Sequence, residues 1–137
     1  MAIELPKQNY TGKIKPVTLG GGDKAVTVGG ETAYNFFSFE GAMPNLPRIA
    51  MEVYDTAPQD WAAAALEPFA DVVSDPLAWA NKCINSYGAE MLCIQLASTD
   101  PNGANAGAEE AANTVHTLLM GCQSGDACVE SINALTL

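Results

Sequence analysis

Residues 48–55 read RIAMEVYD and residues 90–98 read EMLCIQLAS, and these two stretches decide the expected fold. In each stretch, bulky aliphatic residues alternate with smaller or polar ones, which is the two-residue period of a β-strand. Ile49, Met51 and Val53 share one face of the first stretch, and Leu92 and Ile94 repeat the pattern in the second. We therefore expect two strands that each pack one face into a core.

A helix is predicted between the two strands. Asp75 is a typical N-cap residue, Pro76 suits the first helical position, and Gly88 suits a helix stop. The apolar residues at helical spacing, which form the expected buried stripe, are Leu77, Ala80, Ile84 and Tyr87. A short helix is also expected over residues 61–66.

The second strand is followed by a turn-rich loop at residues 98–103 and by a second helix that starts near Ala106. Strands that alternate with helices indicate βαβ units and a parallel sheet, so the fold class is α/β. The second faces of the strands carry Glu52 and Gln95, which favours a barrel over an open sheet covered on both sides. We expect these two residues to form a polar layer inside the barrel, not a catalytic pair.

The N-terminal part differs in pattern. Residues 12–30 predict a β-hairpin that turns at the glycine run 20–22, and no Gly-Lys-Ser/Thr follows to suggest a phosphate-binding loop. Residues 34–39 form an aromatic cluster that we expect to be buried. Residues 44–47 are expected to be a linker, so the predicted domains are 1–46 and 47–137.

The composition disfavours several classes of function. Sixteen acidic and six basic residues give a formal net charge of −10, which disfavours binding to nucleic acid or to anionic membranes. The longest apolar run, residues 61–66, is too short to span a bilayer, and no secretory signal is visible at the N-terminus. We therefore expect a cytoplasmic protein.

The cysteines do not follow a metal-binding pattern. Cys83, Cys93, Cys122 and Cys128 include no Cys-x-x-Cys pair, and His116 is not placed to complete a zinc site. The compact cysteine loop of an iron–sulfur cluster is also missing. We expect reduced, structural thiols, and we expect His116 to be an ordinary surface residue.

Four segments resemble one family in the same order along the chain. They are residues 5–14 (LPKQNYTGKI), 23–31 (DKAVTVGGE), 49–55 (IAMEVYD) and, most distinctively, 95–103 (QLASTDPNG). Together they resemble the start of the corrinoid iron–sulfur protein small subunit, the delta subunit of acetyl-CoA decarbonylase/synthase (CO dehydrogenase/acetyl-CoA synthase). The resemblance runs from about Leu5 to Val115.

The resemblance implies a TIM barrel that pairs with a larger subunit, which carries a [4Fe-4S] cluster and a cobamide of the vitamin B12 type. The cobalt takes a methyl group from a methyl-pterin, such as methyltetrahydrofolate or methyltetrahydrosarcinapterin, through a methyltransferase. It then passes the group to acetyl-CoA synthase, in the Wood–Ljungdahl pathway of carbon fixation or in its counterpart in methanogenesis. The chain would share the cobamide with its partner, and it would carry no catalytic residue, metal ligand or iron–sulfur cluster itself.

Two loops are candidates for contact with the cobamide, because TIM barrels bind ligands at the C-terminal ends of their strands. The residues expected to hydrogen-bond the amide groups of the corrin ring, or the partner, are Tyr54, Asp55, Ser98, Thr99, Asp100 and Asn102. A simpler interpretation is that residues 100–102 only form a turn and cap the second helix.

The chain is too short for eight βα units, so we expect an incomplete barrel of two to three units behind the hairpin, with a divergent tail from about residue 116. One alternative is that residues 117–121 form a third strand, which a further helix over residues 124–135 would follow. The alternative that we favour is that residues 117–121 continue the second helix. The alternatives for function are a pterin-binding TIM-barrel methyltransferase and an inactive gene fragment.

Overall fold

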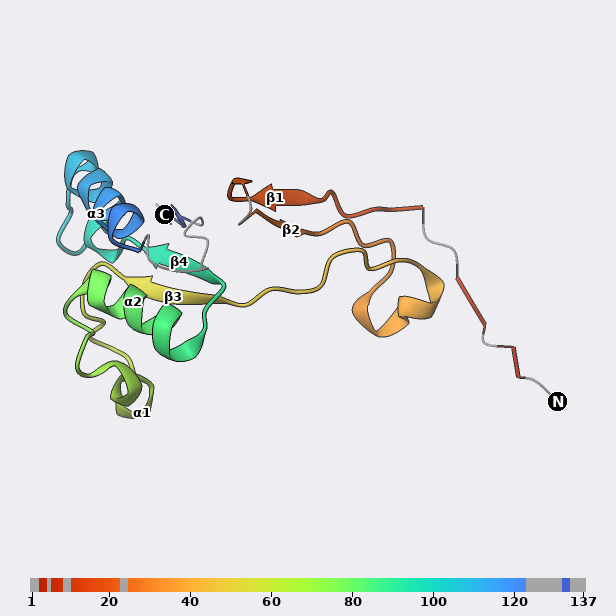
Figure 1. Ribbon diagram of the computed structural model, residues 1–137, viewed down its shortest axis with the longest axis horizontal. Coiled ribbons are helices and arrows are strands. Elements are labelled where there is room, and N and C mark those ends of the chain that lie inside the picture. The colour runs from red at the N-terminus through yellow and green to blue at the C-terminus, as the bar shows by residue number, and fades with distance from the viewer. Residues whose placement is uncertain (1–2, 5, 9–10, 23–24, 123–131, 134–137) are drawn as a thin grey trace. The chain divides into compact units, whose positions relative to one another are not determined.

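The computed structural model describes residues 3–4, 6–8, 11–22, 25–122 and 132–133 (Figure 1). The chain divides into two compact units, Met1–Arg48 and Ile49–Leu137. The division falls two residues after the predicted domain boundary between residues 46 and 47. Each unit is described by itself.

The first unit contains the predicted hairpin, with shorter strands than residues 12–30 allowed. Strand β1 (Val17–Leu19) pairs antiparallel with β2 (Val26–Val28), so that Val17 faces Val28 across the pair. Gly20 and Gly22 adopt positive φ angles of 79° and 62°, which glycine reaches without steric cost. Beyond the strands, the backbone N–H of Ile14 donates to the carbonyl of Glu31 at 2.9 Å, which continues the pairing.

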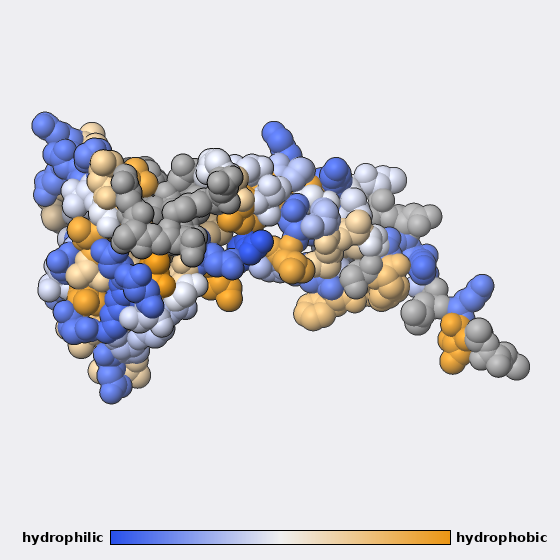
Figure 2. Space-filling model, in the orientation of Figure 1, coloured by the Kyte–Doolittle hydropathy of each residue, from blue (hydrophilic) through white to orange (hydrophobic). Residues whose placement is uncertain are grey.

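The aromatic cluster of the first unit is exposed, so the prediction that it is buried was wrong. It forms a 3₁₀ segment, η2 (Asn35–Glu40), on which Phe36 is 93% exposed; Tyr34, just before it, is 69% exposed. Figure 2 shows this apolar surface. The physical reason is the small size of the unit: among its described residues, no apolar side chain is buried, because one two-stranded ribbon offers no face wide enough to cover the rings.

The second unit is built on a three-stranded parallel sheet of order β3-β4-β5. Figure 1 shows its strands β3 and β4 side by side. Strand β3 (Ala50–Tyr54) pairs with β4 (Met91–Gln95) in the register that places Ala50 beside Met91 and Tyr54 beside Gln95. The parallel pairing of these two strands is what the alternation of strands and helices predicted. Between them lie a short helix α1 (Ala63–Leu66), a 3₁₀ turn η3 (Glu67–Phe69) and helix α2 (Pro76–Tyr87).

Helix α2 begins and ends where its sequence predicted. The Asp75 carboxylate accepts hydrogen bonds from the backbone N–H groups of Leu77 and Ala78, at 3.0 and 3.1 Å, and Gly88 ends the helix with φ 65°. Its buried face is turned from the predicted stripe: Trp79, Ala80 and Cys83 are buried, and Tyr87 is half-exposed. Trp79 takes the central place because its large ring fills the space over the sheet.

Helix α3 (Ala108–Gly121) runs through residues 117–121, which confirms the continuous helix and excludes the third strand there. The third strand lies further on, since β5 (Ile132–Asn133) pairs in parallel with β4. Ile132 is therefore in a strand and not in the helix suggested for residues 124–135. The rest of that predicted helix lies outside the described residues.

The core of the second unit lies between the sheet and the two longer helices. Val53, Leu92 and Ile94 contribute from the strands, Trp79 from α2 and Leu118 from α3, and all five are at most 2% exposed. Val53, Leu92 and Ile94 face inward as the strand alternation predicted, but Ile49 was wrongly placed on that face: it lies just before β3 and is 82% exposed. This packing fixes the C-terminal ends of β3 and β4 next to each other, and the loops that follow form the candidate site. A closed barrel remains a prediction.

Candidate functional site at the strand ends

The two predicted loops lie side by side because their strands are parallel neighbours. Tyr54 and Gln95, the last residues of β3 and β4, are register partners, and the backbone N–H of Asp55 donates to the carbonyl of Gln95 at 3.1 Å. The chain leaves both strands at the same end of the sheet. The site predicted from sequence is therefore spatially continuous for most of its residues.

Asp55 and Ser98 connect the two loops directly. One carboxylate oxygen of Asp55 (Oδ1) accepts a hydrogen bond from the backbone N–H of Ser98 at 3.1 Å. The other (Oδ2) accepts a short hydrogen bond from the Ser98 hydroxyl. Both residues are half-buried. The carboxylate is thus held in one orientation by a single residue 43 positions further along the chain.

The second loop is closed by its own hydrogen bonds. Ser98 and Thr99 lie in the 3₁₀ segment η4 (Ala97–Thr99), and the Thr99 hydroxyl donates to the carbonyl of Leu96 at 2.8 Å. The Asp100 carboxylate accepts from the backbone N–H of Asn102 at 2.8 Å, which makes the predicted turn. These residues do not cap the next helix, since α3 begins after Gly107 without a side-chain cap.

Tyr54 does not join the polar site. Its ring lies in an aromatic cluster, 5.3 Å from the ring centroid of Trp61 and 6.3 Å from that of Trp79. It is half-buried against the hydrophobic core. The structure therefore brings together Asp55, Ser98 and Thr99, leaves Asp100 and Asn102 exposed on the same loop, and places Tyr54 in the packing beneath.

A hollow of about 380 Å³, with a lining that is more apolar than polar, adjoins Asp55. Three carboxylates, those of Asp55, Asp75 and Glu110, line it together with side chains of α3. The contribution of α3 was not predicted, although the sequence carries a signal for it. The α3 residues Glu110, Asn113, Thr114 and Thr117 follow the i, i+3, i+4, i+7 spacing of one helix face and are all polar. The hollow offers mainly hydrogen-bond acceptors.

A comparison with known protein families decides the affiliation of the chain. Residues 16–134 match the family described as CO dehydrogenase/acetyl-CoA synthase delta subunit. The chain belongs to this delta subunit family. The resemblance found in the four sequence segments is thereby confirmed, and the match runs on through the tail that was expected to diverge, as far as β5.

Individual delta subunits agree with the family match. The chain is 38% identical to the acetyl-CoA decarbonylase/synthase complex subunit delta of Archaeoglobus fulgidus over 124 residues, which cover 85% of the chain and 27% of the relative. It is 34% identical to that of Methanocaldococcus jannaschii, with 85% and 30% covered, and 35% identical to that of Methanothermobacter thermautotrophicus, with 83% and 29% covered. The chain thus spans less than a third of the length of these relatives.

In the delta-family chain, burial makes the ionised thiolate form of three cysteines unfavourable. Burial raises the pKa of Cys83 and Cys122, and burial together with the nearby Glu52 carboxylate raises the pKa of Cys93. All three thiols are free; Cys128 lies outside the described residues. Within the described part of the chain, no group of three or more His, Cys, Asp and Glu residues is arranged to hold a metal ion.

The remaining predicted residues of the delta-family chain lie apart from the hollow. Glu52 is exposed and Gln95 is half-buried on β3 and β4, and His116 is exposed on α3 as expected. Over the residues that the structure describes, no helix is both long and apolar enough to cross a membrane.

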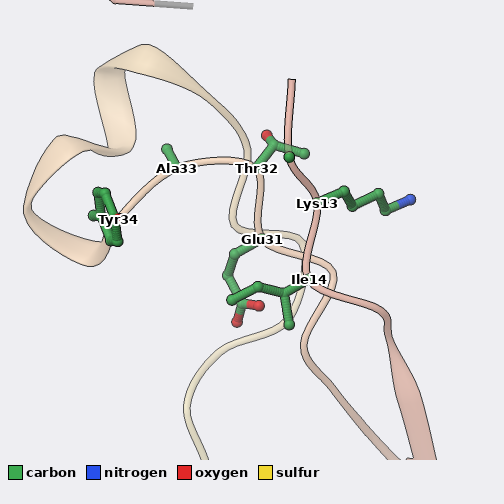
Figure 3. Close-up of a pocket in the computed structure, with 7 residues that line it drawn as sticks. Lys13, Ile14, Glu31, Thr32, Ala33 and Tyr34 are labelled. Atoms are coloured by element: carbon green, nitrogen blue, oxygen red, sulfur yellow. The ribbon is translucent and has the colours of Figure 1, made fainter. Parts of the chain in front are cut away.

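A second hollow, of about 270 Å³, lies in the first unit and has a mostly apolar lining (Figure 3). Ile14, Glu31 and Tyr34 contribute to its lining, and the Lys13 side chain points away from the other labelled side chains. None of the residues predicted to bind a cofactor lies there. The strand-end loops of the second unit therefore remain the candidate site.

Proposed function

We propose that this chain is the part of a delta-type subunit that helps to enclose a cobamide during methyl transfer between a methyl-pterin and acetyl-CoA synthase, in acetyl-CoA synthesis or cleavage. The cobalt of the cobamide would carry the methyl group. The chain itself would position the cofactor and would not perform the chemical step. The family affiliation supports the process, and the strand-end site supports the location.

The observation that carries this proposal is the arrangement of two polar loops at the C-terminal ends of adjacent parallel strands. Asp55 follows β3, and residues 98–102 follow β4, on the same side of the sheet. Ligands of open α/β sheets and of TIM barrels bind at this end of the strands. The location is therefore consistent with a barrel rim that faces a ligand.

The residues present fit the periphery of a cobamide by their chemistry. A corrin ring carries amide side chains, whose N–H groups need acceptors and whose carbonyls need donors. Asp100 and Asn102 are exposed on the loop, and the Glu110 carboxylate lines the hollow that adjoins Asp55. Asparagine supplies both a donor and an acceptor, and carboxylates supply acceptors. The chain would thus bind the rim of the macrocycle through hydrogen bonds.

The partners follow from the same proposal. The matched relatives are named as subunits of an acetyl-CoA decarbonylase/synthase complex. We propose that a larger corrinoid iron–sulfur subunit supplies the iron–sulfur cluster and the remaining contacts to the cobamide. The methyl-pterin methyltransferase and acetyl-CoA synthase would meet the shared cofactor in turn.

The test is cobalamin binding measured by absorption spectroscopy. Hydroxocobalamin is titrated into this chain, alone and mixed with a large corrinoid subunit from a relative. The double variant Asp100→Ala/Asn102→Ala is expected to bind about tenfold more weakly, because each lost hydrogen bond to a buried polar group weakens binding. Asp60→Ala, which removes an exposed carboxylate elsewhere in the unit, serves as the control.

Unchanged cobalamin binding by the double variant would refute the ligand-facing role of this loop. The second candidate, a pterin-binding methyltransferase, is tested in the same way with methyltetrahydrofolate. The exposed Asp100 and Asn102 could serve the donor–acceptor edge of a pterin as well. Tight binding of methyltetrahydrofolate to the chain alone, without cobalamin binding, would favour that enzyme.

A further inference from the structure

The hydrogen bonds between Asp55 and Ser98 are placed where they can control a whole loop. The backbone N–H and the hydroxyl of Ser98 donate to the two carboxylate oxygens of Asp55. The backbone carbonyl of Ser98 in turn accepts the N–H of Ala106 at 2.8 Å. Ser98 is therefore the point at which both ends of the loop 98–106 are joined to each other and to β3.

The interior of this loop is closed around Asp100. The Asp100 carbonyl accepts the backbone N–H groups of Gly103 and Asn105, both at 3.0 Å, and Asn105 has a positive φ of 51°. Asparagine tolerates this left-handed conformation better than most residues do. The loop is thus closed internally by hydrogen bonds to Asp100, and Ser98 attaches it to the residue that follows β3. Its position relative to the sheet depends on what holds Ser98.

We infer that Asp55 is a positioning residue: its carboxylate holds Ser98, and through it the 98–106 loop, so that Asp100 and Asn102 are presented in a fixed place. Asp55 does this without contacting the ligand itself. Both of its oxygens accept hydrogen bonds from Ser98, and the group is half-buried between β3 and η4. This replaces the role of cofactor ligand that the sequence suggested for Asp55 and Ser98. The statement about the ligand depends on the proposed function; the statement about the loop does not.

The Asp55→Asn variant distinguishes the effect of the hydrogen bonds of Asp55 from the effect of its charge. In Asp55→Asn, the amide oxygen can still accept the Ser98 N–H, and the amide N–H₂ can donate to the Ser98 hydroxyl, which also accepts. Asp55→Ala loses both hydrogen bonds. Ser98→Ala loses only the hydroxyl bond, and Ser98→Thr keeps a hydroxyl. Asp60→Ala is the matched control for the loss of a carboxylate.

The first experiment measures amide hydrogen exchange of the whole chain, resolved to Gly103, Asn105 and Ala106. We expect Asp55→Ala to accelerate exchange at these amides about tenfold, because hydrogen bonds to a charged group are among the stronger ones. Asp55→Asn, Ser98→Thr and Asp60→Ala should stay near the original rates. The double variant Asp55→Ala/Ser98→Ala should exchange no faster than Asp55→Ala, since both changes remove the same contact.

Additive acceleration in the double variant, or unchanged exchange in Asp55→Ala, would overturn the inference. If Asp55→Ala does not fold, Ser98→Ala against Ser98→Thr gives the same comparison with a smaller effect. The second experiment is hydroxocobalamin binding. Asp55→Ala should bind about tenfold more weakly and Asp55→Asn should bind nearly as well as the original chain.

The two experiments distinguish failure of the positioning role from failure of the proposed function. If Asp55→Asn binds cobalamin as weakly as Asp55→Ala while its loop exchanges at the original rates, the charge of Asp55 contacts the ligand and the positioning role is wrong. If the original chain binds no cobalamin, with or without a large subunit, the proposed function fails. The exchange measurement would still decide whether Asp55 holds the loop.

Discussion

Single residues decide where α2 begins and ends. Asp75 supplies acceptors to the free N–H groups of the first turn, and Gly88 takes the left-handed conformation that closes the last turn. Both effects depend only on neighbours within a few positions. For this reason the boundaries of α2 were predictable from the sequence.

The N-cap gives the first testable prediction. Asp75→Ala is expected to lower the free energy of unfolding by about 1 kcal/mol, because two helix N–H groups lose their acceptor. Urea unfolding followed by circular dichroism measures the change. Ser74→Ala, one residue earlier and exposed, should change stability little. An equal loss in both variants would contradict the capping role.

Gly121 gives a second prediction, which depends on the room for a side chain between α3 and α2. A Cβ atom at this position would overlap the side chain of Leu77, where α3 approaches α2. Gly121→Ala should therefore destabilise the protein by about 1 kcal/mol, although alanine favours helix more than glycine does. Gly107→Ala is the control, since nothing lies near its Cβ. A stabilised Gly121→Ala variant in the same urea titration would show that Leu77 moves aside freely.

The buried thiols give a prediction for pH. Burial raises the pKa of Cys83 and Cys122 above the ordinary 9.0, so the folded chain holds these protons more tightly than the unfolded chain does. Stability should be unaffected by these groups below the ordinary value and should fall as pH rises through the raised values. Urea unfolding between pH 7 and about 10 measures this. The Cys83→Ala variant should lose less stability than the original chain over this pH range. If both lose the same amount, the loss comes from other groups.

At the scale of elements, α2 is fixed to the sheet by an aromatic cluster. Trp79 contacts the rings of Tyr54, Trp61 and Phe69, with ring centroids 5.5–6.3 Å apart. Among the described residues, the Trp79 indole N–H is buried without a hydrogen-bond partner. The helix is therefore held by ring packing and not by that polar group.

The cluster gives a fourth prediction. Trp79→Ala should lower the free energy of unfolding by about 3–5 kcal/mol, because it leaves a large cavity. Trp79→Phe should cost less than half as much, since it keeps a ring in the cluster and removes the unpartnered N–H. Urea unfolding monitored by circular dichroism measures both variants. Similar losses for both would mean that the indole N–H contributes more than its missing partner suggests.

Helix α3 presents surfaces of different character to its surroundings. Its polar stripe lines the hollow beside Asp55, and Leu118 is buried in the core. A third surface, formed by α3 with Leu96, is an apolar hollow of about 370 Å³, lined by Ala111, Val115 and Leu119 among others. Leu119 on this surface is 41% exposed. The expected further βα units of a barrel would supply a cover for such a face.

At the scale of the whole molecule, charge is distributed unevenly between the two units. Five of the six lysine and arginine residues precede residue 49, and twelve of the sixteen acidic residues follow it. The formal charges are +1 for the first unit and −11 for the second. This net negative charge opposes self-association, whereas the exposed apolar side chains on η2 and α3 favour it.

We expect the isolated chain to be marginally stable or to self-associate. Sedimentation velocity should show species larger than the monomer, and a thermal melt should be broad. Phe36→Ser should reduce the association, because Phe36 is the most exposed aromatic residue on η2, whereas Asn35→Ser beside it should not. A purified monomer with a sharp, cooperative melt would contradict this expectation.

The candidate site was predictable in part. Asp55 and Ser98 were identified as members of two loops, since strand ends and turn residues are readable from local patterns. Their mutual hydrogen bonds, and the position of Tyr54 among the rings of Trp61 and Trp79, were not. The polar face of α3 was not predicted, because its place beside Asp55 depends on packing between segments far apart in the chain.

The amino-acid sequence by itself determined the order of strands and helices from the hairpin to α3, the boundaries of α2 and the family, because each depends on short-range periodicity, capping residues or continuous motifs. Only the tertiary structure decided which face of α2 is buried, that η2 stays exposed, and that Ile132 pairs with Ile94 in β4. These features depend on the shape and the free hydrogen-bonding edges of segments far apart in the chain, which no local pattern contains.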